Sequence, residues 1–232
     1  MTSTPLVCQT RRLRMRCFQP GDHARLVAMH REPRLRELLI DDFDLDQPAR
    51  VWQFLQGLGH LQARLPGLGI WHTERWRPPD PGTLAQAQAA VDSGELAQEA
   101  LQWLRDGSWD FCGWFNLMPM PGHPQRVEIG CRLLPAAWGA GLVLDGGEAL
   151  LDRAFGPLQL GEVWAACHPQ HRSVQAVLAT LGFAALGMAP YCGQPASLHC
   201  LQAADWRCVR QQPRRQRQRL AHHALGQATL AR

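Results

Sequence analysis

Two glycines in the middle of the chain stand where a bound phosphate is expected. Gly139 and Gly141 form a Gly-x-Gly turn between an apolar run over residues 127–134 and a helical pattern. Glycine lets a chain turn tightly and expose consecutive N–H groups, and a helix start adds about half a positive charge. A tight turn without a ligand has the same pattern, so both readings stay open. The amides expected to hold a phosphate or diphosphate belong to Gly139, Ala140, Gly141, Leu142 and Val143.

Alternating strands and helices must position this turn. The run over 127–134 favours a strand, and the apolar spacing after the turn favours a helix. A second strand is expected over 163–167, followed by a helix that Gly182 ends. A dinucleotide-binding fingerprint would need a third glycine where Leu144 stands, so the sequence disfavours that site.

This segment resembles the GNAT acetyltransferase superfamily, most closely the ribosomal-protein N-terminal (alanine/serine) acetyltransferases and their small-molecule relatives. The motifs follow one another at family-like spacings over about 55 residues, and weaker similarity extends over residues 12–201. They are Glu128-Ile129-Gly130, Leu133-Leu134-Pro135, Trp138-Gly139-Ala140-Gly141, His168-Pro169 and Leu181-Gly182-Phe183. The resemblance implies an α/β (α+β) GNAT fold, with a mixed, mostly antiparallel twisted sheet, a splayed central strand pair and flanking helices.

The resemblance also implies a coenzyme site for acetyl-CoA as cosubstrate, without a metal. The pantetheine arm would enter between two parting strands and meet the main chains of Leu133 and Leu134. His171 takes the place of a family asparagine and is expected to touch the pantetheine or cap a helix. A structural histidine is the alternative there.

Catalysis of amine acetylation needs a base for the amine and an acid for the leaving thiol. Glu128 is the candidate base, acting directly or through water, and Ser173 is a candidate hydrogen-bond partner of the coenzyme sulfur. Tyr191 is the only tyrosine of the chain, so a phenol acid can only be Tyr191. A strand-edge carboxylate and a helix-surface serine are the structural alternatives for the first two residues.

Several positions depart from the family's pattern. Ala136 stands where an arginine or glutamine usually opens the diphosphate loop, and Leu178 stands where many members carry a catalytic tyrosine. Val174 replaces a serine of the second motif. These departures motivate an alternative reading as a non-catalytic acyl-CoA-binding regulator.

Composition favours an ordinary globular protein of the cytoplasm. Hydrophobic residues make up 46% and charged residues 19% of 232 residues, and no apolar run reaches the length of a membrane span. The first residues lack a secretory apolar region. The eight cysteines are expected to stay reduced thiols. All 24 basic residues are arginines, and a net charge of +4 is too small to argue for nucleic acid by itself.

Residues 1–206 are expected to form one GNAT-like domain. A helical insertion over about 77–109 separates two strands and contains a helix over 83–104; it would cover a site, build a dimer contact or have no measurable role. The other elements expected outside the motif region are strands at 12–18, 69–76, 110–118, 184–187 and 197–201, and helices at 23–30 and 48–63.

Two charged segments carry further expectations. Asp41, Asp42, Asp44 and Asp46 form either a solvated loop or a negative rim that attracts a cationic amine. Residues 207–232 form an arginine-rich tail, expected to be solvated and partly mobile, with binding to RNA or the ribosome as the alternative.

The sequence therefore predicts an N-acetyltransferase that transfers acetyl from acetyl-CoA to a primary amine of a protein N-terminus or a small molecule. The alternatives are the acyl-CoA-binding regulator and a ribosome- or RNA-associated module. A homodimer is compatible with the sequence, nucleic acid would bind only through the tail, and no membrane partner is expected.

Overall fold

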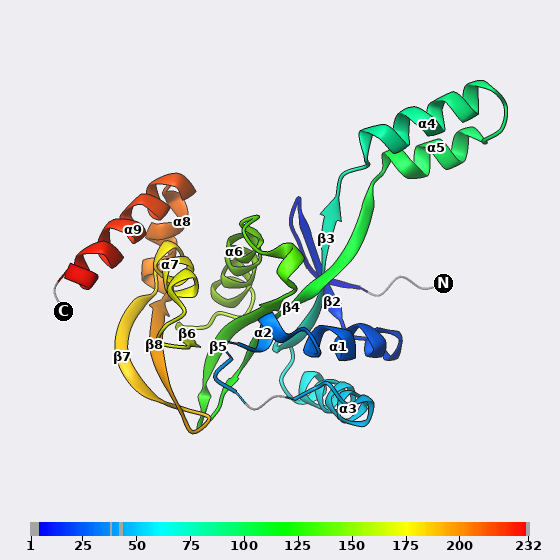
Figure 1. Ribbon diagram of the computed structural model, residues 1–232. Coiled ribbons are helices and arrows are strands. Elements are labelled where there is room, and N and C mark those ends of the chain that lie inside the picture. Colours follow the sequence, from blue (N-terminus) through cyan, green and yellow to red (C-terminus); the bar gives the residue numbers. More distant parts are fainter. Residues whose placement is uncertain (1–4, 38, 42–43, 231–232) are drawn as a thin grey trace.

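A computed structural model describes residues 5–37, 39–41 and 44–230, and Figure 1 shows their arrangement. The described strands form one eight-stranded sheet in the order β1-β2-β3-β4-β5-β6-β8-β7. Only β5 and β6 pair in parallel; the other neighbours are antiparallel. The expectation of a mixed, mostly antiparallel sheet is confirmed. The strands are β1 (Leu6–Gln9), β2 (Leu13–Cys17), β3 (Gly69–Arg77), β4 (Ser108–Met120), β5 (His123–Leu133), β6 (Glu162–Cys167), β7 (Ala184–Tyr191) and β8 (Gln194–Gln202).

Helices cover both faces of the sheet (Figure 1). One face packs against α1, α2 and α3 through a core that includes Leu26, Val51 and Trp114. The other packs against α6 and α7 through a larger core that includes Phe115 and Leu150. The helices are α1 (His23–His30), α2 (Pro33–Arg36), α3 (Pro48–Arg64), α4 (Pro81–Asp92), α5 (Gln98–Arg105), α6 (Leu142–Phe155), α7 (Arg172–Thr180), α8 (Ala203–Gln211) and α9 (Arg214–Leu230).

The insertion differs from its prediction. A single helix was expected over 83–104, but α4 and α5 form a hairpin. The chain reverses near Gly94, whose φ of +79° suits a residue without a side chain. Figure 1 shows this hairpin between the end of β3 and the start of β4, projecting away from the body of the molecule. It therefore does not cover the helices beside the sheet.

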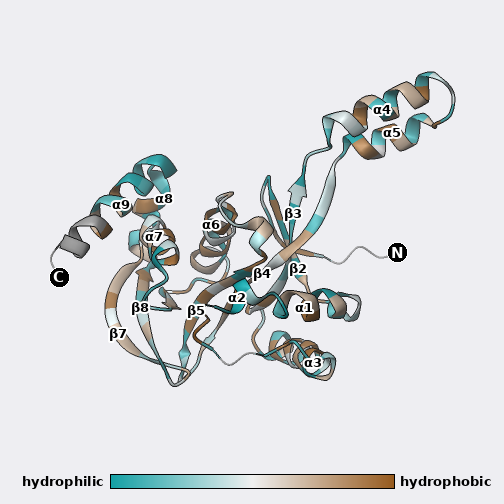
Figure 2. Cartoon of the chain, in the orientation of Figure 1, coloured by the Kyte–Doolittle hydropathy of each residue, from teal (hydrophilic) through white to brown (hydrophobic). Residues whose placement is uncertain are grey.

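The expectation of a solvated C-terminal tail holds only in part for the described residues, because Arg207, Arg215 and Arg219 are exposed but the segment is helical and packed. Residues 203–230 form α8 and α9, separated at Pro213, and α9 packs along α7. Arg217 is buried and donates to Glu148 of α6. Figure 2 shows hydrophilic residues at the start of α9 and a mixture of hydrophilic and hydrophobic residues along α8. The arginine spacing concealed the fact that several of these side chains point inward to acids.

Helix α6 lies close to the sheet because of small residues on its inner face. A Cβ on Gly146 would lie 2.2 Å from the ring of Phe115, and one on Gly147 would lie 2.9 Å from Leu181. Glycine at these positions therefore allows the helix to approach β4 and the end of α7. Among the described residues, no helix combines the length and apolarity needed to cross a membrane.

Candidate active site

The Gly-x-Gly turn has the geometry expected of an anion-binding loop. Gly139 and Gly141 adopt φ values of +74° and +71°, and Gly141 is the N-cap of α6. A Cβ on Gly139 would meet nothing within 4 Å. Within the described chain, the amides of residues 139–143 have no protein acceptor. These N–H groups at a helix start are therefore available to a ligand.

The central strands part next to this loop. β5 and β6 share one register pair, Glu128 with Trp164, although β5 continues to Leu133 and β6 to Cys167. The predicted splay is thus present, and its vertex lies at Glu128. An arm of a coenzyme that enters the fork would point its end toward this residue.

Glu128 and Tyr191 come together at the vertex, although 63 positions separate them. The Tyr191 hydroxyl donates to Glu128 Oε1 over 2.8 Å. Burial raises the pKa of Glu128 to about 7, against the opposing effect of the Tyr191 hydrogen bond. Burial together with the neighbouring Glu128 carboxylate raises the pKa of Tyr191, so its phenol stays protonated. A carboxyl that is partly ionised at neutral pH and a protonated phenol are suited to move one proton between them.

His171 and Ser173 lie at the start of α7, which follows β6 directly. His171 is the N-cap of the helix, and its Nδ1 lies 3.1 Å from Ser173 Oγ. Burial, with a smaller effect of His168, lowers the pKa of His171 and favours its neutral ring. In the structure the two side chains contact each other. Their contacts with a coenzyme stay a prediction.

The main chains of Leu133 and Leu134 each have a hydrogen-bond partner within the protein. The Leu134 N–H donates to the Cys112 carbonyl, and the Leu133 carbonyl accepts from the Trp138 indole at 2.6 Å. Leu134 therefore turns its N–H toward β4 rather than into the fork. Trp138 stands at the mouth of the fork with 43% of its surface exposed, and sequence reasoning assigned no role to its side chain.

Two arginines that the sequence did not single out hold the loop. Arg12 Nη1 donates to the Ala140 carbonyl at 2.7 Å, and Arg75 Nη1 donates to the Ala136 carbonyl at 2.5 Å. Ala136 is the position at which the sequence lacks the arginine or glutamine usual in the family. Sequence separations of 128 and 61 residues explain why no local pattern pointed to these contacts.

Two of the four acids of the acidic loop pair with arginines, which weakens the interpretation of the loop as a negative rim. Asp41 pairs with the buried Arg132 of β5, and Asp44 pairs with Arg36 and Arg50. Asp42 lies outside the described residues. Arg132 follows Glu128 by four positions on the same face of β5 and lies over the Trp114 ring at 5.0 Å.

The family of the chain is established by direct comparison. The family model of the acetyltransferase (GNAT) domain matches residues 12–184. The chain belongs to the GNAT acetyltransferase family. The match includes the loop, the fork and the start of α7, and it ends before Tyr191, α8 and α9. It therefore confirms the resemblance on which the acetyl-CoA site was predicted.

Solved GNAT-like structures share the fold at low sequence identity. RimJ of Mycobacterium smegmatis, solved in complex with CoA-disulfide, has a TM-score of 0.61 at 16% identity, with 90% of this chain and 89% of that chain covered. An acetyltransferase from Agrobacterium tumefaciens str. C58 has a TM-score of 0.57 at 17% identity, with 87% and 96% covered. A GCN5-related N-acetyltransferase from Brucella melitensis has a TM-score of 0.58 at 12% identity, with 90% and 84% covered.

A curated relative matches over a shorter stretch. The FsC-acetyl coenzyme A-N(2)-transacetylase of Aspergillus fumigatus is 30% identical over 87 residues, which are 34% of this chain and 37% of that protein. The chain thus aligns with little more than a third of this relative's length. Its named activity bears on the present chain only as a proposal.

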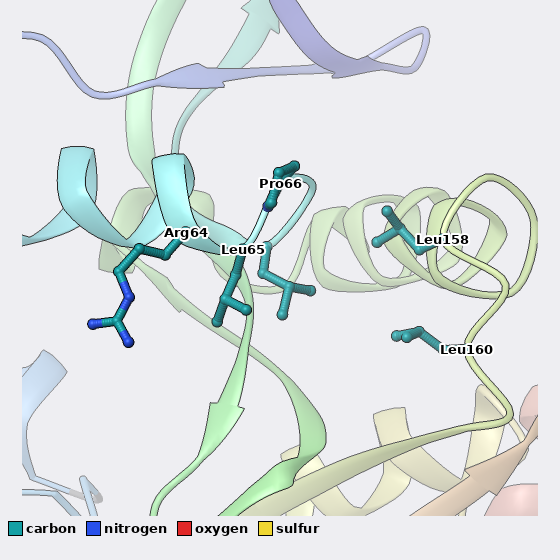
Figure 3. A pocket seen from close by; sticks show the side chains of 6 residues that line it. Arg64, Leu65, Pro66, Leu158 and Leu160 are labelled. Carbon is teal, nitrogen blue, oxygen red and sulfur yellow. The ribbon is translucent and has the colours of Figure 1, made fainter.

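The pocket in Figure 3 lies away from the GNAT site. It has a volume of about 240 Å³ and sits between the C-terminal end of α3 and the segment that follows α6. The loop precedes α6, so the pocket is at the opposite end of that helix. The residues that line the pocket are Arg64, Leu65, Pro66, Leu68, Leu158 and Leu160.

Among the described residues, no group of three or more His, Cys, Asp or Glu side chains has the arrangement of a metal site.

Proposed function

We propose that the protein transfers an acetyl group from acetyl-CoA to a primary amine of a protein N-terminus or a small molecule. The observation that carries this proposal is the pair of Glu128 and Tyr191 at the vertex of the fork, 2.8 Å apart. Family membership implies the coenzyme, and the pair supplies a base and an acid on the acceptor side. The pairing of Asp41 and Asp44 with arginines leaves the acidic loop without a clear preference between the two classes of amine.

The coenzyme would occupy the loop and the fork. Amides of residues 139–143 would bind the diphosphate, and the pantetheine arm would run between β5 and β6 toward Glu128. Leu133 would meet the arm through its main chain, where its carbonyl now accepts from Trp138. His171 and Ser173 would face the arm from the start of α7. This placement puts the thioester beside the base.

The reaction needs one net proton transfer from the amine to the sulfur. The neutral amine attacks the thioester carbon, and the C–S bond breaks as the new C–N bond forms. Glu128 accepts a proton from the attacking nitrogen, while Tyr191 gives its proton to the departing thiolate. The protonated Glu128 then returns a proton to Tyr191 along their hydrogen bond, so both residues end as they began. Proximity of amine and thioester supplies a further share of the rate.

Turnover on an amine panel tests the proposal. CoA release from acetyl-CoA would be measured with peptides that begin with alanine or serine and with small amines. Glu128→Gln should lower kcat on the best acceptor by about a hundredfold to ten-thousandfold, the usual contribution of a positioned base. Glu162→Gln is the matched control, because Glu162 is a β6 carboxylate that bonds Trp164 and Gln202 instead.

The outcomes separate the alternatives. Unchanged turnover in Glu128→Gln would exclude Glu128 as the base. Tight binding of acetyl-CoA without turnover on any amine would favour the non-catalytic regulator. For the RNA-associated module, Arg210, Arg214 and Arg217 of the tail pair with acids of α6, whereas Arg207, Arg215 and Arg219 are exposed.

A further inference from the structure

An acid lies in the first turn of the helix that would bind the coenzyme diphosphate. Asp145 follows the N-cap Gly141 by four positions, and its side chain is 11% exposed. A carboxylate is favourable at an empty helix start, but it repels a phosphate bound at the same place. Some positive group must compensate Asp145 if the loop is to hold a diphosphate.

Two arginines from distant parts of the chain bind Asp145, one on each carboxylate oxygen. Arg12 donates from Nε to Oδ2 at 2.6 Å, and its Nη2 also lies 2.6 Å from Oδ2. Arg214 of α9 donates from Nη1 to Oδ1 at 2.7 Å. These hydrogen bonds outweigh burial and lower the pKa of Asp145, so the group stays ionised. Asp145 is thus paired with two arginines, of which Arg214 is shared with a second carboxylate, that of Glu148.

Arg12 also reaches the loop itself. Its Nη1 donates to the Ala140 carbonyl at 2.7 Å, and its Nη2 lies 3.6 Å from the Cβ position of Gly141. Among the described residues, the contacts of Arg12 with Asp145 and Ala140 engage three of its five guanidinium N–H groups. The Arg12 side chain is 42% exposed. Two N–H donors are therefore left on a guanidinium that Asp145 and Ala140 hold in place beside the anion-binding amides.

Arg214 is itself fixed by a second acid of α6. It donates to both oxygens of Glu148, at 3.0 and 2.7 Å, while Arg217 donates to Oε1 at 2.6 Å. The residues that hold Asp145 from this side belong to α9, which lies outside the residues 12–184 that match the family. The helix α9, which lies outside the family match, thus binds acids in the first half of α6.

We propose that Arg12 binds the diphosphate of the coenzyme in place of the arginine or glutamine absent at Ala136, with Asp145 and Arg214 as positioning residues. The inference rests on the proposed function, because it assumes a CoA-type ligand at the loop. Arg12 supplies charge and its two remaining N–H donors, whereas Arg214 supplies a second positive charge to Asp145.

Calorimetric titration with two probes tests the role of Arg12. Coenzyme A carries the diphosphate, and pantetheine lacks it. Arg12→Gln should weaken coenzyme A binding by about tenfold to a hundredfold, the effect of losing a charge-assisted contact, and leave the pantetheine Kd unchanged. Arg11→Gln is the matched control, since it removes the same charge from the exposed neighbouring residue and should leave both Kd values unchanged.

A double variant separates direct binding from compensation of Asp145. If Arg12 contacts the ligand, Arg12→Gln/Asp145→Asn stays weak for coenzyme A. Recovery of the wild-type Kd in this double variant would overturn the inference, as would an unchanged coenzyme A Kd or an equal loss for pantetheine in Arg12→Gln. Failure of the wild-type protein to bind coenzyme A at all would instead refute the proposed function, and this inference with it.

Discussion

Glu148 of α6 offers a quantitative test of how the C-terminal helices contribute to stability. Its side chain is 8% exposed, and its partner Arg217 is 4% exposed. Glu148→Gln keeps the shape but removes the negative charge, which leaves Arg217 buried beside the carbonyls of Thr180 and Gln212. Breaking a buried pair in this way costs about 3–5 kcal/mol of unfolding free energy.

Asp152, another acid of α6, provides the internal control for this prediction. Asp152 pairs with Arg210, and the two side chains are 44% and 46% exposed. Solvent screens such a pair, so Asp152→Asn should cost at most about 1 kcal/mol. Its Oδ1 also accepts the Trp206 indole N–H, and asparagine can keep that bond. Urea unfolding of both variants, with midpoint and slope measured, gives the two losses.

The pH dependence adds an independent check. Burial acts to raise the pKa of Glu148, but the hydrogen bonds from Arg214 and Arg217 lower it overall. A lowered carboxyl pKa contributes stability above the pKa of the unfolded chain and loses it as pH falls through the folded value. The gap between wild type and Glu148→Gln should therefore narrow on acidification. Equal losses for Glu148→Gln and Asp152→Asn, or a gap that is independent of pH, would refute the reasoning.

Two further predictions concern the packing of α6 and the proposed catalytic pair. Gly146→Ala should destabilise the fold by about 1–3 kcal/mol in thermal or urea unfolding, because its Cβ would overlap the buried ring of Phe115. Gly57→Ala, in an exposed helix position with nothing within 4 Å, should stabilise by up to about 1 kcal/mol; a loss at both sites would contradict the contact argument. Tyr191→Phe removes a hydrogen bond that opposes the effect of burial on the pKa of Glu128, which is about 7 with that bond in place. The acidic limb of kcat/KM against pH should move up by about one unit, and an unmoved limb would show that Glu128 is not the group that titrates.

Local features of the sequence determined the anion-binding loop and the elements around it. Glycines at 139 and 141, an apolar strand before them and a helical pattern after them specify a turn with exposed amides, because each effect acts within a few residues. The boundaries of α1 and α3 also followed from local apolar periodicity, with one residue of difference at the end of α3. The insertion was harder, since a single glycine in a helix-favouring segment decided between one helix and two.

Tertiary structure alone decided what surrounds the loop and the vertex. Tyr191 of β7 meets Glu128 of β5 although β6 and β8 stand between these two strands in the sheet, and no short-range pattern encodes that contact. The arginine-rich tail looked solvated because charge is usually exposed, yet Arg217 is buried since acids of α6 lie opposite it. Charge and spacing are properties of the chain, whereas the partner of a charge is a property of the fold.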